Sequence, residues 1–243
     1  KIPNLFRRFF AEGAFNQAFI PIYTDYQKSN NLDQTRDFLN AIAGILLIFL
    51  FIFTILVLIF APVFILIFAP GFYFDPIKQN ISIDVLRIMF PYLALISLVA
   101  FAGGIQNTHQ KFSVPAFTPV IFNLCLIVSA IFIAPLYDMP IYVLAWGVLL
   151  AGMLQLLIQI SPLLSINRLP VPKLDIKNPG LRKFFKLILP AILAGGVIQI
   201  NLLIDTIFAS LLETGSPTWL YVSDRLIQFP MGIFAIAIGT ILL

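Results

Sequence analysis

Long apolar runs separated by short polar connections dominate the chain from residue 39 onward. A helix needs about 20 mainly apolar residues to span a bilayer. Runs of sufficient length lie at about 39–69, 84–108, 114–136, 140–164 and 184–212, and another begins near residue 218. The first of these is so long that we expect it to tilt, to kink at Pro62 or to project beyond the bilayer. The pattern predicts an all-α, polytopic integral membrane protein.

The stretch at 3–27 is also apolar enough to lie among membrane helices, but it carries charges near its start. Charges in a membrane helix are costly and are expected to face a cavity, a partner charge or the membrane surface. Helical spacing puts Arg7 on one face with Asn4 and a run of small residues, which favours a cavity wall. Arg8 and Glu12 are four residues apart and fit a structural salt bridge equally well. Placement of all three charges among the lipid headgroups is the alternative.

The end of the chain repeats this arrangement of a basic residue followed by small residues on one face. Arg225 shares a helical face with Gln228 and with several small residues, and Asp224 adjoins that face. Asp205 lies in the middle of another apolar run, with Asn201 one turn before it. A carboxylate within a membrane is a functional candidate, here protonated, paired with an arginine or part of a cation site.

Composition supports a membrane protein and argues against most catalytic classes. The chain is 60% hydrophobic and only 11% charged, with a mean hydropathy of +1.00. A soluble domain is about one quarter charged. We find no phosphate-binding loop, nucleophile motif or metal-ligand motif, so we expect no enzyme activity. His109 is expected to be solvated in a charged loop, and the basic residues do not form a nucleic-acid-binding pattern.

The distribution of Lys and Arg predicts the orientation in the membrane. Loops near 28–38, 107–113 and 165–183 carry most of the positive charge, whereas the alternate loops carry little. The positive-inside rule places the first set in the cytoplasm. Because the chain starts with Lys1 and stops within an apolar run, we expect it to be a fragment of a longer protein.

Several stretches resemble the MurJ (MviN) family of lipid II flippases. KIPNLFRRFFAEGAFNQAFIPIYTDY resembles the family's second helix, and NTHQKFSVPAFTPVIFN resembles its loop between helices four and five. PAILAGGVIQINLLIDTIFASLL and WLYVSDRLIQFPMGIFAIAIGTILL resemble helices seven and eight. The resemblance covers essentially the whole chain.

The resemblance implies a helical exporter with two six-helix lobes around a central cavity. Residues 1–166 would form helices two to six of the N-lobe, 167–183 a cytoplasmic linker, and 184–243 the start of the C-lobe. The implied activity is transfer of lipid II from the inner to the outer leaflet of the bacterial cytoplasmic membrane by alternating access. The implied partners are lipid II and membrane lipids, without nucleic acid, and the protein is expected to be monomeric.

The family motifs also imply roles for individual residues. Arg7 and Arg225 correspond to arginines that the family needs in its cationic cavity, and we expect Asn4 to bind substrate beside them. Supporting positions are Arg8, Glu12, Asp224 and Gln228. Gln228 stands where some members carry Glu, which puts a carboxylate role there in doubt.

Asp205 stands where some members have Asn, and it is a candidate sodium ligand; no other cofactor is expected. Alternatives are an exporter of another polyprenyl-linked glycan or of drugs, and a membrane scaffold without transport activity. A drug exporter would favour a more aromatic or acidic cavity.

Overall fold

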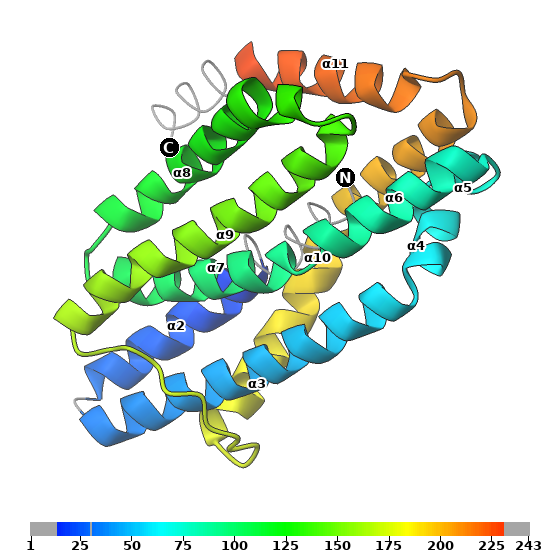
Figure 1. Cartoon of the computed structure of the whole chain (residues 1–243). Helices are drawn as coiled ribbons and strands as arrows, with labels where there is room; N and C mark the ends of the chain where they lie inside the picture. Colours follow the sequence, from blue (N-terminus) through cyan, green and yellow to red (C-terminus); the bar gives the residue numbers. More distant parts are fainter. Residues whose placement is uncertain (1–13, 30, 231–243) are drawn as a thin grey trace.

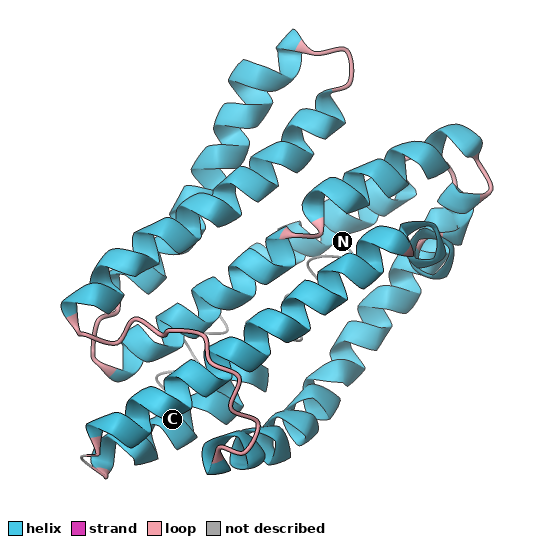
Figure 2. Cartoon of the chain, turned by 60° about the horizontal axis from the view of Figure 1, so that its bottom comes forward, coloured by secondary structure: helices cyan, strands magenta, loops and turns pink. Residues whose placement is uncertain are grey.

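The computed structural model describes residues 14–29 and 31–230, which form a bundle of helices joined by short loops and by one longer linker (Figures 1 and 2). The α-helices are α2 (Ala14–Lys28), α3 (Leu32–Ile59), α4 (Ala61–Phe68), α5 (Pro70–Tyr73), α6 (Pro76–Met89), α7 (Tyr92–Thr108), α8 (Ser113–Val128), α9 (Pro140–Ser165), α10 (Pro179–Leu211) and α11 (Ser216–Pro230). A π-helical turn, η2 (Ser129–Ile133), and a 3-10 turn, η3 (Ala134–Leu136), extend α8.

Four helical segments in the described part of the chain are long and apolar enough to cross a membrane. They are Leu32–Ile59, Pro76–Thr108, Ser113–Leu136 and Pro140–Ser165. α10 adds a shorter apolar helical stretch, Gln199–Leu211. The predicted all-α, multi-pass class is therefore confirmed.

Prolines divide two of the long apolar runs. The break expected at Pro62 occurs between α3 and α4, where Pro62 lies in the first turn of α4. Proline tolerates that position because the first helical N–H groups have no intrahelical partner. A second break, at Pro91 between α6 and α7, is not evident from the apolar pattern. The helix also starts earlier than the expected residue 84, because Asp75 caps α6 at Pro76.

The main core lies where α2 meets α3, α7 and α10. Phe19, Tyr23 and Phe38 are fully buried, and the Phe19 and Tyr23 rings stack with centroids 5.3 Å apart. Leu181 and Phe184 of α10 enter the same cluster. Although α10 follows the linker, its first turns pack into the same core as α2. This packing fixes the position at which α10 and then α11 begin.

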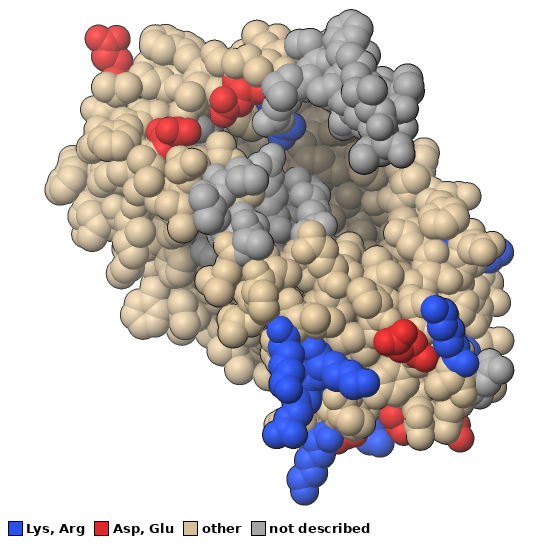
Figure 3. Space-filling view, turned by 180° about the vertical axis from the view of Figure 1, so that it is seen from behind, with Lys and Arg blue, Asp and Glu red and all other residues tan. Residues whose placement is uncertain are grey.

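One end of the bundle, here called the basic end, carries most of the basic side chains (Figure 3). It comprises Lys28, Arg36, Lys111, Arg168, Lys173, Lys177, Arg182, Lys183 and Lys186. The linker between α9 and α10 is held there by Asn40, whose carbonyl accepts from Lys173 N at 3.0 Å and whose side chain accepts from Val171 N at 2.8 Å.

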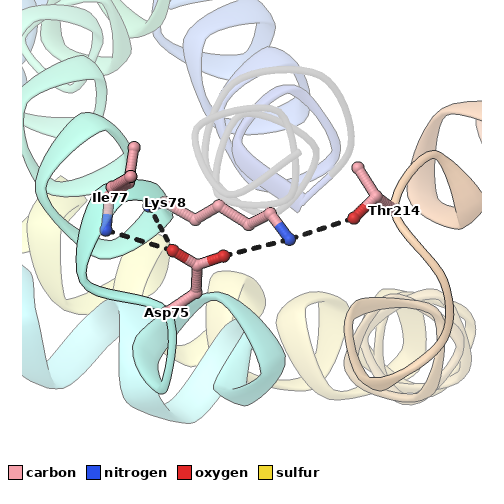
Figure 4. Close-up of polar contacts among 4 residues, drawn as sticks. All are labelled: Asp75, Ile77, Lys78 and Thr214. Carbon is pink, nitrogen blue, oxygen red and sulfur yellow. Dashed lines mark hydrogen bonds and ion pairs between the residues drawn. The ribbon is translucent and has the colours of Figure 1, made fainter.

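At the opposite end, polar contacts join the start of α6 to the loop between α10 and α11 (Figure 4). Asp75 accepts from the backbone of Ile77 and Lys78 at 3.1 and 3.2 Å. Lys78 Nζ lies 3.2 Å from Asp75 Oδ2 and donates to Thr214 Oγ1 at 3.0 Å. The hydrogen bonds that Asp75 accepts from the backbone and the side chain of Lys78 hold the pKa of Asp75 below its ordinary value.

The two glutamines of α9 bond to neighbouring helices. Gln155 Nε2 donates to the Thr118 carbonyl of α8 at 2.8 Å. Gln159 Oε1 accepts from Gln106 Nε2 of α7. All three glutamines are almost fully buried. Interhelical hydrogen bonds therefore account for these polar residues within the apolar bundle.

Candidate functional site

Some of the predicted site residues lie in the described part of the chain, and others lie outside it. Asn4, Arg7, Arg8 and Glu12 lie outside the described residues. The backbone of Gln228 lies in α11, but its side chain is outside the described part. The structure can therefore be compared with the prediction at Asp205, Asp224 and Arg225.

Arg225 lies in the third turn of α11 with an exposed side chain. Its Nε donates to the hydroxyl oxygen of Tyr221 at 3.2 Å. The guanidinium carbon also lies 5.2 Å from the centre of the Tyr221 ring, within the range of a cation–π contact. Tyr221 precedes Arg225 by one helical turn, so α11 itself supplies the contact.

Asp224 is half-buried beside Arg225, on a neighbouring face of α11. Adjacent helical residues point about 100° apart, so they do not face each other. Within the described ranges, neither Asp224 nor Arg225 forms an ion pair. No ion pair with these residues therefore offsets the positive charge of Arg225.

Asp205 lies on α10, where both it and Asn201 are exposed. A sodium site needs several oxygen ligands. No group of three or more His, Cys, Asp and Glu side chains in the described part of the chain could hold a metal ion. The assignment of Asp205 as a sodium ligand stays a prediction.

The face turned away from Figure 1 is hollowed in its middle, and a basic side chain shows at the edge of the hollow (Figure 3). Apart from the basic end, the described basic residues are Lys78, Arg87 and Arg225. Lys78 and Arg87 bond to Thr214 and to the Leu58 carbonyl, respectively. Arg225 differs because its hydrogen-bond partner is a residue of its own helix.

Ala14 and Ala18 are the described small residues on the helical face predicted to carry Arg7, and both are packed against other helices rather than exposed to a cavity. Ala14 and Ala18 are 5% and 1% exposed, and α2 contacts α7 and α10 over this region. Small side chains here permit close helix approach. The cavity wall inferred for this face does not include Ala14 and Ala18.

The structure also identifies a polar cluster at the basic end that the sequence did not predict. His109 is half-buried, and its Nε2 lies 2.9 Å from the Tyr23 hydroxyl and 2.7 Å from Gln27 Nε2. Burial, followed by the positive charge of Arg168, lowers the pKa of His109. The expectation that His109 is simply solvated was wrong, because α2 covers the end of α7. A partner 86 residues away leaves no local sequence signal.

A multi-pass helical bundle with ionisable side chains on its apolar helices is typical of membrane transport proteins, where such residues mark the path of a polar substrate. The comparisons narrow this class. The sequence matches the family described as "Lipid II flippase MurJ" over residues 1–243. The chain therefore belongs to the MurJ family.

Individual relatives agree with this assignment. A probable lipid II flippase MurJ of Buchnera aphidicola subsp. Acyrthosiphon pisum is 44% identical over 242 residues, covering 100% of this chain and 47% of that relative. The probable lipid II flippase MurJ of Haemophilus influenzae is 42% identical, covering 100% of this chain and 49% of the relative. The chain spans about half the length of the curated relatives that it matches.

The fold also matches a solved structure. A lipid II flippase MurJ in an inward closed conformation superposes with a TM-score of 0.81 at 25% sequence identity. The match covers 99% of this chain and 49% of the solved chain. The helical arrangement described above is thus that of the MurJ fold.

Proposed function

We propose that this chain forms part of a lipid II flippase, which moves the lipid-linked peptidoglycan precursor from the inner to the outer leaflet of the bacterial cytoplasmic membrane. The observation that carries the proposal is the match to the lipid II flippase family over all 243 residues. The protein acts as a transporter and not as an enzyme. No observation favours a drug or another glycan as its substrate.

The chemistry of the substrate explains why arginines are needed on apolar helices. Lipid II carries a pyrophosphate and a large polar head, which cannot cross hydrocarbon unaided. A guanidinium keeps its charge in a poorly solvated site and forms two parallel hydrogen bonds to phosphate oxygens. In the proposal, Arg7 and Arg225 bind the pyrophosphate, and Asn4 contacts the same head group.

The supporting residues set the charge around these arginines. In the proposal, Glu12 pairs with Arg8, which lies four residues before it in the sequence, while Asp224 and Gln228 flank Arg225. Because Asp224 makes no described ion pair with Arg225, the arginine remains available to an anion. A sodium ion at Asp205 is a separate part of the proposal, and sodium-dependent stabilisation that survives Asp205→Asn would contradict it.

The proposed transport cycle is alternating access, with the basic end in the cytoplasm. The lipid tail stays in the bilayer while the head group passes between the lobes. The protein works as a monomer, and an ion gradient or the membrane potential supplies the energy.

Complementation of a flippase-depleted bacterium tests this proposal. Arg7→Ala and Arg225→Ala, each made in the full-length protein, are expected to abolish growth because each removes a phosphate-binding cation. Lys177→Ala is the matched control, since it removes an exposed positive charge from the linker. Normal growth with either arginine variant at wild-type expression would refute the role of a cationic cavity.

A further inference from the structure

We infer that Tyr221 is a positioning residue, which holds the Arg225 guanidinium with both terminal nitrogens free to bind a phosphate group. The inference rests on the proposed function, because it assigns a role to Tyr221 within the same substrate site. It is carried by the hydrogen bond and the ring contact that join these two side chains.

The direction of α11 explains why the two side chains meet. Long side chains on a helix lean toward its N-terminus, over the residue one turn earlier. Arg225 therefore leans over Tyr221, which places its Nε 3.2 Å from the hydroxyl and its guanidinium carbon 5.2 Å from the ring centre. Two contacts at different points of the tyrosine restrict both the position and the tilt of the guanidinium plane.

The atoms used in this contact determine what Arg225 can still bind. A guanidinium has five N–H donors, and the single N–H on Nε is the one that Tyr221 accepts. Among the described residues, no hydrogen bond engages the N–H groups on the two terminal nitrogens, and these form an edge that can bind two oxygens of a phosphate. The Tyr221 hydroxyl also keeps its own proton, which can be donated to a third oxygen.

A neutral partner suits this role better than a carboxylate would. An ion pair with Asp224 would cancel the positive charge of Arg225, whereas a phenol orients the guanidinium and leaves its charge intact. In the described part of the chain, Asp224 forms no ion pair with Arg225. Fixing a flexible side chain in its binding geometry lowers the entropy that is lost when the ligand binds.

The contact is poorly placed to serve stability alone. Both residues are exposed, Tyr221 to 45%. Exposed contacts of this kind contribute little to the free energy of unfolding. A role in positioning Arg225 explains the geometry of this contact, although the contact adds little to the stability of the fold.

Binding of lipid II to the full-length protein in nanodiscs tests the inference. Tyr221→Phe keeps the ring and removes the hydroxyl, so we expect the Kd for lipid II to rise about three- to tenfold. Tyr221→Leu, which removes both contacts, should weaken binding further. In an Arg225→Ala background both changes should have almost no additional effect, because the residue that Tyr221 positions is gone.

Tyr142→Phe is the matched control. It removes a tyrosine hydroxyl that donates to Asp84 at 3.2 Å, on helices other than α11. It should leave lipid II binding unchanged. An unchanged Kd in Tyr221→Phe, or an equal loss with and without Arg225, would overturn the inference.

A second readout separates this inference from the proposed function. The Nε–Hε NMR signal of Arg225 in the full-length protein should shift in Tyr221→Phe, and its hydrogen should exchange faster with water. Retention of lipid II binding with no such change would overturn the role of Tyr221 alone. Failure of the wild-type protein to bind lipid II would refute the proposed function, and with it the substrate assigned to this site.

Discussion

His109 shows how the surroundings of one residue change its chemistry. Gln27 Nε2 is a donor, so His109 Nε2 accepts this hydrogen bond and carries no proton when the bond is formed. A proton on Nε2 would oppose this donor, and burial, followed by the positive charge of Arg168, lowers the pKa of His109. Among the described residues, Tyr23 and Arg168 are the titratable and charged groups that face the ring.

Acidification should therefore weaken the contact between α2 and α7. The pKa of His109 is lower in the folded chain than in the unfolded chain, so its stabilising effect is complete above about pH 6.5 and is lost below it. We expect Tm to fall less between about pH 7.5 and pH 5.5 in His109→Gln than in the wild type, because the glutamine side chain does not titrate. The same pH dependence in both proteins, measured by thermal unfolding of the full-length protein, would contradict this role.

At the junction of α5 with α10, there is no space for a side chain on Gly71. Gly71 N donates to Ser210 Oγ at 3.2 Å, and a Cβ on Gly71 would lie 1.7 Å from the Ser210 carbonyl oxygen. Backbone atoms cannot yield as a flexible side chain can. Only glycine allows this approach, which brings the two helices together near the contact between Lys78 and Thr214.

Gly71→Ala should force α5 and α10 apart. Overpacking of this kind costs about 1–3 kcal/mol, so we expect a clearly lower Tm for the full-length protein. Gly103→Ala is the control, because its Cβ would meet Pro115 Cβ at an ordinary distance of 3.5 Å. A loss of Tm no greater than that of Gly103→Ala would show that the junction tolerates separation.

Sequence patterns predicted the elements well where local physics determines them. Four of the predicted apolar runs match the described helical segments that are long enough to cross a membrane, and the break expected at Pro62 lies between α3 and α4. The partners of Gln155 and Gln159 lie on α8 and α7, and no local sequence pattern identifies them. The environment of His109 and the packing at Gly71 depend on residues far away in the chain, which a single sequence does not reveal.

For the candidate site, the helical face of Arg225 could be predicted, whereas its contact with Tyr221 required the structure.

For the whole molecule, the charge distribution predicts which end faces the cytoplasm. Lys173 of the linker is exposed at the basic end, and Glu213 is exposed in the loop at the opposite end. In a full-length protein with its cysteines replaced, Lys173→Cys should react with a membrane-impermeant thiol reagent only after the cells are opened. Glu213→Cys should react in intact cells. The reverse pattern would contradict the proposed orientation.

Transfer of lipid II between leaflets tests the central claim most directly. Full-length protein reconstituted in liposomes with fluorescent lipid II, under an imposed membrane potential, should expose the inner-leaflet lipid to an external quencher. Arg225→Ala should fold and reconstitute as the wild type does, but it should reduce the transfer rate to that of protein-free liposomes. Equal transfer by the wild type and Arg225→Ala, or no transfer by the wild type under any imposed gradient, would contradict a flippase that acts through a cationic cavity.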